Sequence, residues 1–105
     1  MSLFDFLKKP DINEGLQRFH KTPGAVLLDV RTKEEYDGGH IPGSVCIPLD
    51  QIAKAKEKIP GLKTPVFVYC LRGSRSRQAA AALKQMGYEN ALSIGGISGY
   101  KGKRE

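Results

Sequence analysis

The sequence predicts an α/β domain with a mostly parallel sheet, and two observations carry this prediction. Continuous apolar runs of strand length alternate with stretches of helical spacing along the chain, which is the pattern of sheets flanked by helices. The two clearest runs, residues 25–28 and 65–69, are apolar at successive positions. This is typical of parallel strands that are buried on both faces.

The chain length predicts a single domain, because 105 residues with 40% hydrophobic content suffice for one modest core. We expect residues 11–105 to form this domain. Residues 1–10 are expected to form an N-terminal arm that packs on it, since a small apolar cluster stops at Pro10. The members of this cluster are Leu3, Phe4, Phe6 and Leu7.

Membrane insertion and export are not predicted. No stretch of the sequence approaches the roughly 20 apolar residues that span a bilayer. The N-terminus also lacks a signal peptide's order of basic region, long apolar run and small-residue cleavage site. We therefore expect a cytoplasmic protein that does not contact the membrane, or a periplasmic one if a leader has been removed.

The first helix is predicted from its start signal. Asp11 places an acceptor at an N-cap position, Glu14 follows three residues later, and apolar residues then recur at helical spacing at Ile12, Leu16 and Phe19. This helix is expected to end near residues 22–24. The strand at 25–28 follows directly and is closed by Asp29.

The remaining elements follow in alternation. The expected strands are 45–47, 65–69 and 91–94, and the expected helices are 33–37, 51–58 and 77–86. The last helix is the clearest, because it is rich in good helix formers and meets Gly87 where a C-cap glycine belongs. Ser76 is a good N-cap for its start at Arg77. Its apolar face contains Ala79, Leu83 and Met86.

The two cysteines, Cys46 and Cys70, have neither metal-site spacing nor the density of a disulfide scaffold. We expect no metal and no cofactor. A bridge between them is the alternative to two free thiols, although disulfides rarely persist in reducing compartments. Cys46 lies between Val45 and Ile47 in a predicted strand, without a neighbouring base or cation, and is expected to be a small core residue.

The charge of the chain favours an anionic partner. Seventeen Lys and Arg against eleven Asp and Glu give a formal net charge of +6. Much of this surplus lies at residues 8–9 and 101–104, where solvated ends are the simpler explanation. Nucleic acid is not expected as a partner, because the basic residues are not interleaved with aromatic ones.

Cys70 stands where chemistry is expected in such a fold, at the end of a strand and shortly before a helix. Three effects at this point lower a thiol pKa and stabilise the thiolate: a nest of backbone N–H groups, the positive end of the helix, and the charges of Arg72 and Arg75. Gly73 lets the loop close without a Cβ in the way. The sequence therefore predicts a nucleophilic thiolate that meets an anionic electrophile.

Three motifs carry a resemblance to a known family. Cys70-x-x-Gly73-x-Arg75-Ser76 resembles the active-site loop of rhodaneses, and the glycine pair Gly95-Gly96 resembles the pair that follows their last strand. The segments 27–31, 34–36 and 39–44 resemble the upstream signature of the family. The motifs follow one another in the family's order and spacing from about residue 25 to 100. Tyr100 departs from the pattern, because relatives often have Trp there.

This resemblance implies a rhodanese-like fold, a five-stranded, mainly parallel sheet flanked by helices. It also implies a sulfurtransferase in which Cys70 takes sulfur from thiosulfate as a persulfide and passes it to cyanide or to a thiol, such as that of a protein like thioredoxin. Arg75 would bind the substrate oxyanion and support the loop, and Arg72 would attract and orient the substrate. We expect a monomer. The implied active-site loop consists of Leu71, Arg72, Gly73, Ser74, Arg75 and Ser76.

Other functions remain as alternatives. One is a persulfide relay or a regulatory interaction module with little turnover of thiosulfate. Another is a cysteine-dependent phosphatase or arsenate reductase, which shares the fold but has five residues between Cys and Arg, whereas four separate Cys70 from Arg75 here. The chemistry requires no general base once the thiolate exists. We therefore interpret a further polar set as turn and ion-pair residues, namely Asp29, Arg31, Glu35 and His40.

Overall fold

Four parallel strands form the sheet of the computed structural model, which describes residues 10–105. The central strands are β1 (Val26–Asp29) and β3 (Val66–Cys70), and the outer ones are β2 (Val45–Cys46) and β4 (Ala91–Gly96). Their order is β2-β1-β3-β4. The predicted α/β class is thus confirmed, but the described residues form four strands rather than five. The predicted N-terminal arm, residues 1–10, lies outside the described part of the chain except for Pro10.

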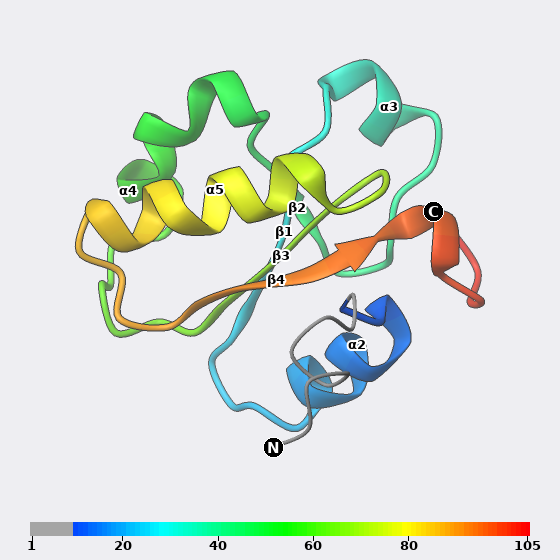
Figure 1. The fold of residues 1–105 in the computed structure, drawn as a ribbon, viewed down its shortest axis with the longest axis horizontal. Coiled ribbons are helices and arrows are strands. Elements are labelled where there is room, and N and C mark those ends of the chain that lie inside the picture. The colour runs from blue at the N-terminus through cyan, green and yellow to red at the C-terminus, as the bar shows by residue number, and fades with distance from the viewer. Residues whose placement is uncertain (1–9) are drawn as a thin grey trace, which may run out of the picture.

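Helices cover both faces of the sheet (Figure 1). Helix α2 (Ile12–His20) lies on one face, and α3 (Lys33–Asp37), α4 (Ala55–Lys58) and α5 (Ser74–Gln85) lie on the other. Within residues 10–105, no helix is both long and apolar enough to cross a membrane.

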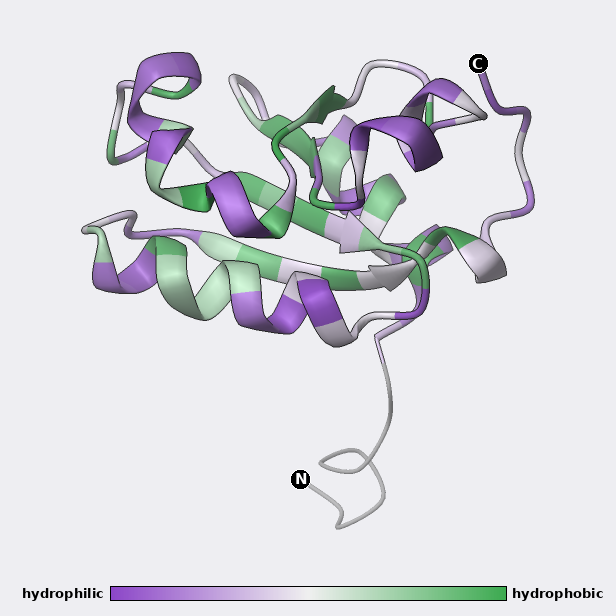
Figure 2. Cartoon of the chain, turned by 90° about the horizontal axis from the view of Figure 1, so that it is seen from above, coloured by the Kyte–Doolittle hydropathy of each residue, from purple (hydrophilic) through white to green (hydrophobic). Residues whose placement is uncertain are grey.

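The buried strands serve two cores because successive side chains point to opposite faces. Leu28, Val68 and Cys70 belong to the core beneath α4 and α5, whereas Leu27 and Phe67 belong to the core against α2. Figure 2 shows the apolar strands of the sheet beside helices that carry both polar and apolar residues. The prediction that these strands are buried on both faces is therefore confirmed.

Several predicted signals act as expected. The Asp11 carboxylate accepts a hydrogen bond from the Asn13 N–H at 2.9 Å and caps α2, and Gly87 follows α5 with a φ of +107°. The predicted helix 51–58 differs, because the chain forms a 3-10 helix, η1 (Leu49–Lys54), before α4. The N–H of Leu49 is bonded to the Val30 carbonyl at 3.1 Å, which ties the start of this segment to the end of β1.

The predicted start of the last helix is wrong. α5 begins at Ser74 rather than Arg77, and its N-cap is Gly73 rather than Ser76. The reason is the left-handed conformation of Gly73, with φ of +110°, which turns the chain into the helix early. Ser76 consequently lies in the first helical turn and is fully buried. This early start brings the helical N–H groups close to Cys70.

Candidate active site

Strand β3 delivers Cys70 to the carboxyl edge of the sheet, where the loop to α5 curls around its sulfur. The side chain is 1% exposed, and the backbone N–H of Gly73 donates to Sγ at 3.0 Å. A backbone donor this close favours the thiolate over the thiol, because it stabilises the negative charge on sulfur.

The environment of Cys70 lowers its pKa. Burial by itself raises the pKa of the thiol, but this is outweighed by groups that can donate to the thiolate, namely the backbone N–H and hydroxyl of Ser76 and the N–H groups of Gly73 and Arg72. The result is a pKa below the ordinary thiol value. The main stabilisation comes from the backbone and a hydroxyl at the helix start. The arginine charges that the sequence suggested are not the main cause.

Gly96, the second glycine of the pair on β4, makes room for this loop. A Cβ on Gly96 would overlap with the carbonyl oxygen of Leu71 and lie 2.5 Å from Cα of Arg72. The N–H of Ser98 also donates to the Leu71 carbonyl at 3.1 Å. The loop thus rests directly on the backbone of β4, which explains why a residue without a side chain is required at Gly96.

The start of α5 is tied to β4 through two serines. The Ser76 hydroxyl lies 2.9 Å from the Gly73 carbonyl oxygen and 2.7 Å from the hydroxyl of Ser93. Ser93 is on β4, paired with Val68 in the sheet. These contacts fix the turn at Gly73, whose N–H donates to the Cys70 sulfur, both to the first turn of α5 and to β4.

Arg75 is engaged by an ion pair with Glu35 of α3. Its two terminal nitrogens donate to the Glu35 carboxylate at 2.7 and 3.1 Å. Hydrogen bonding to Arg75 is the main cause that lowers the pKa of Glu35 to about 2. Glu35 is itself fixed by a capping box with Thr32. This arrangement supports the loop from α3, while Arg75 remains about one-third exposed beside the site.

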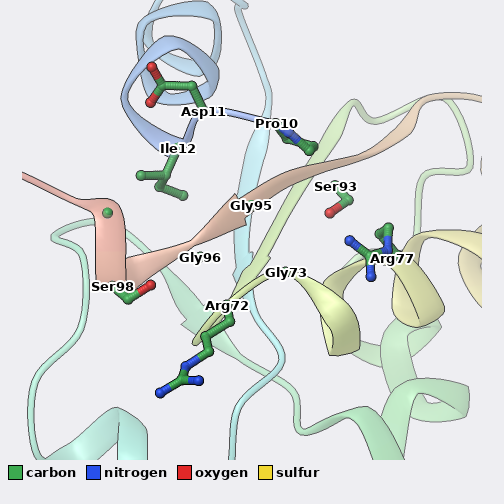
Figure 3. Close-up of a pocket in the computed structure, with 11 residues that line it drawn as sticks. Pro10, Asp11, Ile12, Arg72, Gly73, Arg77, Ser93, Gly95, Gly96 and Ser98 are labelled. Atoms are coloured by element: carbon green, nitrogen blue, oxygen red, sulfur yellow. The ribbon is translucent and has the colours of Figure 1, made fainter. Parts of the chain in front are cut away.

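Arg72 is exposed and lines a cavity of about 200 Å³ on the outer side of the loop (Figure 3). In this view the Arg72 side chain extends away from β4, whereas Arg77 of α5 lies beside Ser93. The cavity is otherwise lined by glycine, serine and the start of α2, at Pro10, Asp11, Ile12, Gly73, Gly95, Gly96, Ser98 and Gly99. Cys70 does not line this cavity.

The other polar residues near the sheet edge form structural contacts, as their interpretation from the sequence predicted. Arg31 is 4% exposed and pairs with the fully buried Asp29 at 2.7 Å, while also donating to the Gly39 carbonyl at 2.8 Å. The ring of His40 stacks on Tyr36 at 3.7 Å. His40 also exchanges two backbone hydrogen bonds with Glu105, at 3.0 and 2.8 Å.

Cys46 is a free thiol, as is Cys70, so the alternative of a bridge between them is not realised. Cys46 is only partly buried at the end of the outer strand β2, rather than enclosed in a core. Burial raises its pKa. Within residues 10–105, no cluster of three or more His, Cys, Asp or Glu side chains could hold a metal ion.

Sequence reasoning missed two contacts of the site. The pairing of Glu35 with Arg75 joins residues 40 positions apart, and the pairing of Ser93 with Ser76 joins residues 17 positions apart. The only signal for the first was that Glu35 lies in the upstream motif. For the second no local signal exists, because a serine in a strand has many ordinary explanations.

The fold and the site together define a class, an α/β domain in which backbone N–H groups surround a cysteine of lowered pKa at the end of a parallel strand. Comparison with known proteins specifies the family. Residues 12–103 match the rhodanese-like domain. A solved structure described as a rhodanese with anions from Escherichia coli superimposes with a TM-score of 0.72 at 30% identity, over 77% of this chain and 96% of that one.

Two sequence relatives agree. YrkF of Bacillus subtilis, whose name describes it as a candidate sulfur carrier, is 33% identical over 100% of this chain, which spans 52% of its length. The thiosulfate sulfurtransferase PspE of Escherichia coli is 35% identical over 67% of this chain and 68% of its own. The chain belongs to the rhodanese-like sulfurtransferase family.

Proposed function

We propose that this domain transfers sulfane sulfur through a persulfide on Cys70. The observation that carries the proposal is the position of the Cys70 sulfur at the end of β3, where it accepts a hydrogen bond from the Gly73 N–H at 3.0 Å. Four residues separate Cys70 from Arg75 in this loop. Such a cradle stabilises a negative sulfur, both as the attacking thiolate and as the leaving thiolate.

In the first half-reaction, the Cys70 thiolate attacks the outer sulfur of thiosulfate. A new S–S bond forms to Cys70, the S–S bond within thiosulfate breaks, and sulfite leaves with the electron pair. The exposed Arg72 and the partly exposed Arg75 provide positive charge beside the loop for this dianion. The similarity to PspE, which is named a thiosulfate sulfurtransferase, supports thiosulfate as the donor.

In the second half-reaction, an acceptor thiolate or cyanide attacks the outer sulfur of the persulfide. The bond to the Cys70 sulfur breaks, and Cys70 returns to the thiolate that the loop stabilises. A thiol protein such as thioredoxin is the acceptor we propose, in the cytoplasm and with the domain as a monomer. The two free cysteines agree with a reducing compartment.

A persulfide relay is the second candidate, and the name of YrkF as a candidate sulfur carrier favours it. In that case Cys70 would receive sulfur from a protein persulfide, and thiosulfate would react slowly. The chemistry at Cys70 is the same for both candidates, because a thiolate attacks a sulfane sulfur in each.

The proposal is tested by incubating the protein with thiosulfate and measuring sulfite release and the mass of the Cys70 peptide. We expect one added sulfur atom on Cys70 and sulfite release in equal amount. Cys70→Ser should abolish both, while the matched variant Cys46→Ser should retain them.

Two results would overturn the proposal of sulfur transfer. One is the absence of a persulfide with thiosulfate and with a protein persulfide donor alike. The other is undiminished sulfite release by Cys70→Ser. A Cys70-dependent hydrolysis of an aryl phosphate would instead favour the phosphatase alternative.

A further inference from the structure

Ser93 is close to the catalytic loop but belongs to a different part of the chain. It lies on β4, shares a strand face with Ala91, and is therefore directed toward α5 rather than α2. Its hydroxyl is 2.7 Å from the hydroxyl of Ser76 in the first turn of α5. Figure 3 shows Ser93 beside this start of the helix.

The direction of this hydrogen bond follows from the number of protons. Ser76 has one hydroxyl proton, and carbonyl oxygens can only accept. Its contacts with the carbonyls of Gly73 at 2.9 Å and Gly95 at 3.4 Å therefore both use that proton. The contact between the two hydroxyls must then be made by the proton of Ser93. Ser93 donates, and Ser76 Oγ accepts.

This direction matters when charge develops on Cys70. The Ser76 proton can turn from the Gly73 carbonyl toward the sulfur, since the Ser76 hydroxyl is among the groups that stabilise the thiolate. The bond from Ser93 keeps Ser76 Oγ paired in either orientation, so the turn leaves no buried hydroxyl oxygen without a partner. A donated bond also polarises the Ser76 O–H group and strengthens its own donation.

We propose that Ser93 is a positioning residue for sulfur transfer, which acts on Cys70 through Ser76 by orienting the Ser76 hydroxyl. Ser93 does not touch the reacting sulfur. The inference deepens the proposed function, since it names a residue that tunes the same nucleophile from outside the loop motif. The role in sulfur transfer rests on the proposed function. The effect on the pKa of Cys70 does not, because this pKa is measurable without any sulfur donor.

The test measures the alkylation rate of Cys70 by iodoacetamide against pH, followed by mass spectrometry of the Cys70 peptide. Ser93→Ala should move the midpoint of the rate profile to higher pH and lower the rate below the midpoint by about fivefold, the loss typical of one hydrogen bond. Ser98→Ala serves as the matched control, because Ser98 has an exposed hydroxyl and lines, like Ser93, the cavity beside Arg72. It should leave the profile unchanged.

A second pair of variants separates positioning from folding. Ser93→Thr and Ser93→Val have the same shape and differ in the hydroxyl, so Thr should retain the wild-type profile and Val should shift it as Ala does. Equal profiles for Thr and Val would overturn the proposal, as would a lower unfolding temperature in Ser93→Ala with an unchanged profile. Neither readout requires thiosulfate, so failure of the proposed donor would be seen separately, in the sulfite assay.

Discussion

The two cysteines of this domain end parallel strands of the same sheet, yet their surroundings push their thiols in opposite directions. Cys70 ends β3, is 1% exposed, and has a pKa below the ordinary value. Cys46 ends β2, is more exposed, and has a pKa raised chiefly by burial and then by the charge of Asp29. The more deeply buried thiol is therefore the more acidic one.

The difference between the two pKa shifts follows from the acceptors to which the backbone N–H groups after each strand donate. After Cys46, the N–H of Ile47 donates to the Asp29 carbonyl at 3.0 Å, Pro48 has none, and the N–H of Leu49 donates to the Val30 carbonyl at 3.1 Å. After Cys70, a glycine turn leaves the N–H groups of the loop and of the helix start directed at the sulfur. Free donors, rather than exposure, decide which thiol ionises.

The largest expected effect comes from filling the space under the Cys70 loop. Gly96→Ala should lower the free energy of unfolding by about 2 kcal/mol or more, since overpacking against backbone is costly. It should also slow alkylation of Cys70 while leaving Cys46 unchanged. Chemical denaturation and peptide-resolved alkylation measure both. Gly38→Ala is the control, because the new Cβ would lie 3.4 Å from the nearest atom, the Glu34 carbonyl oxygen, and the φ of Gly38 is −76°. Equal effects of the two substitutions would contradict this account of the loop.

The pH dependence of alkylation tests the comparison itself. The rate for Cys70 should reach half its maximum below the ordinary thiol range, and that for Cys46 above it, because the folded-state pKa values are shifted in opposite directions. Below pH 7, Cys70 should therefore be labelled first despite its burial. Mass spectrometry of the two peptides checks this order. Preferential labelling of the more exposed Cys46 would show that exposure, rather than the thiol pKa, determines the order of labelling.

The ion pair that supports the Cys70 loop gives a smaller effect, which depends on pH. The pKa of Glu35 is lowered to about 2, so its contribution to stability is present above its ordinary pKa and is lost as pH falls toward 2. Glu35→Gln should thus cost about 1 kcal/mol at pH 7, given partial screening by solvent, and almost nothing at pH 2. Denaturant titrations at both pH values measure this. Glu34→Gln, an exposed neighbour, should show no such pH-dependent loss.

The smallest expected effect concerns the surroundings of Cys46. The ammonium group of Lys58 donates to the Cys46 carbonyl at 3.3 Å, and its charge lowers the thiol pKa without cancelling the effect of burial. Lys58→Gln should therefore slow alkylation of Cys46 at pH 8 by about twofold, as befits an exposed charge. Cys70 should be unaffected. A change at Cys70 would show that the two thiols are not independent.

Much of the fold was predictable because its signals are local. The apolar runs at 25–28 and 65–69 predicted the two central strands, and Asp11 and Gly87 marked helix ends as expected. The start of α5 was mispredicted because Ser76 has the chemistry of an N-cap. The left-handed turn at Gly73 places the helix start earlier, and the freed Ser76 hydroxyl bonds back to the Gly73 carbonyl.

The sequence by itself determined the α/β class, the position of Cys70 at a strand end and the family, because periodicity, turn residues and motif spacing are properties of neighbouring residues. The tertiary structure decided which groups meet that cysteine. Glu35 reaches Arg75, Ser93 reaches Ser76, and Gly96 supports the loop only after the strands are in register. The tertiary structure also decided that the N–H groups after Cys46 bond to carbonyls at the end of β1. Such contacts join distant parts of the chain, and packing alone brings them together.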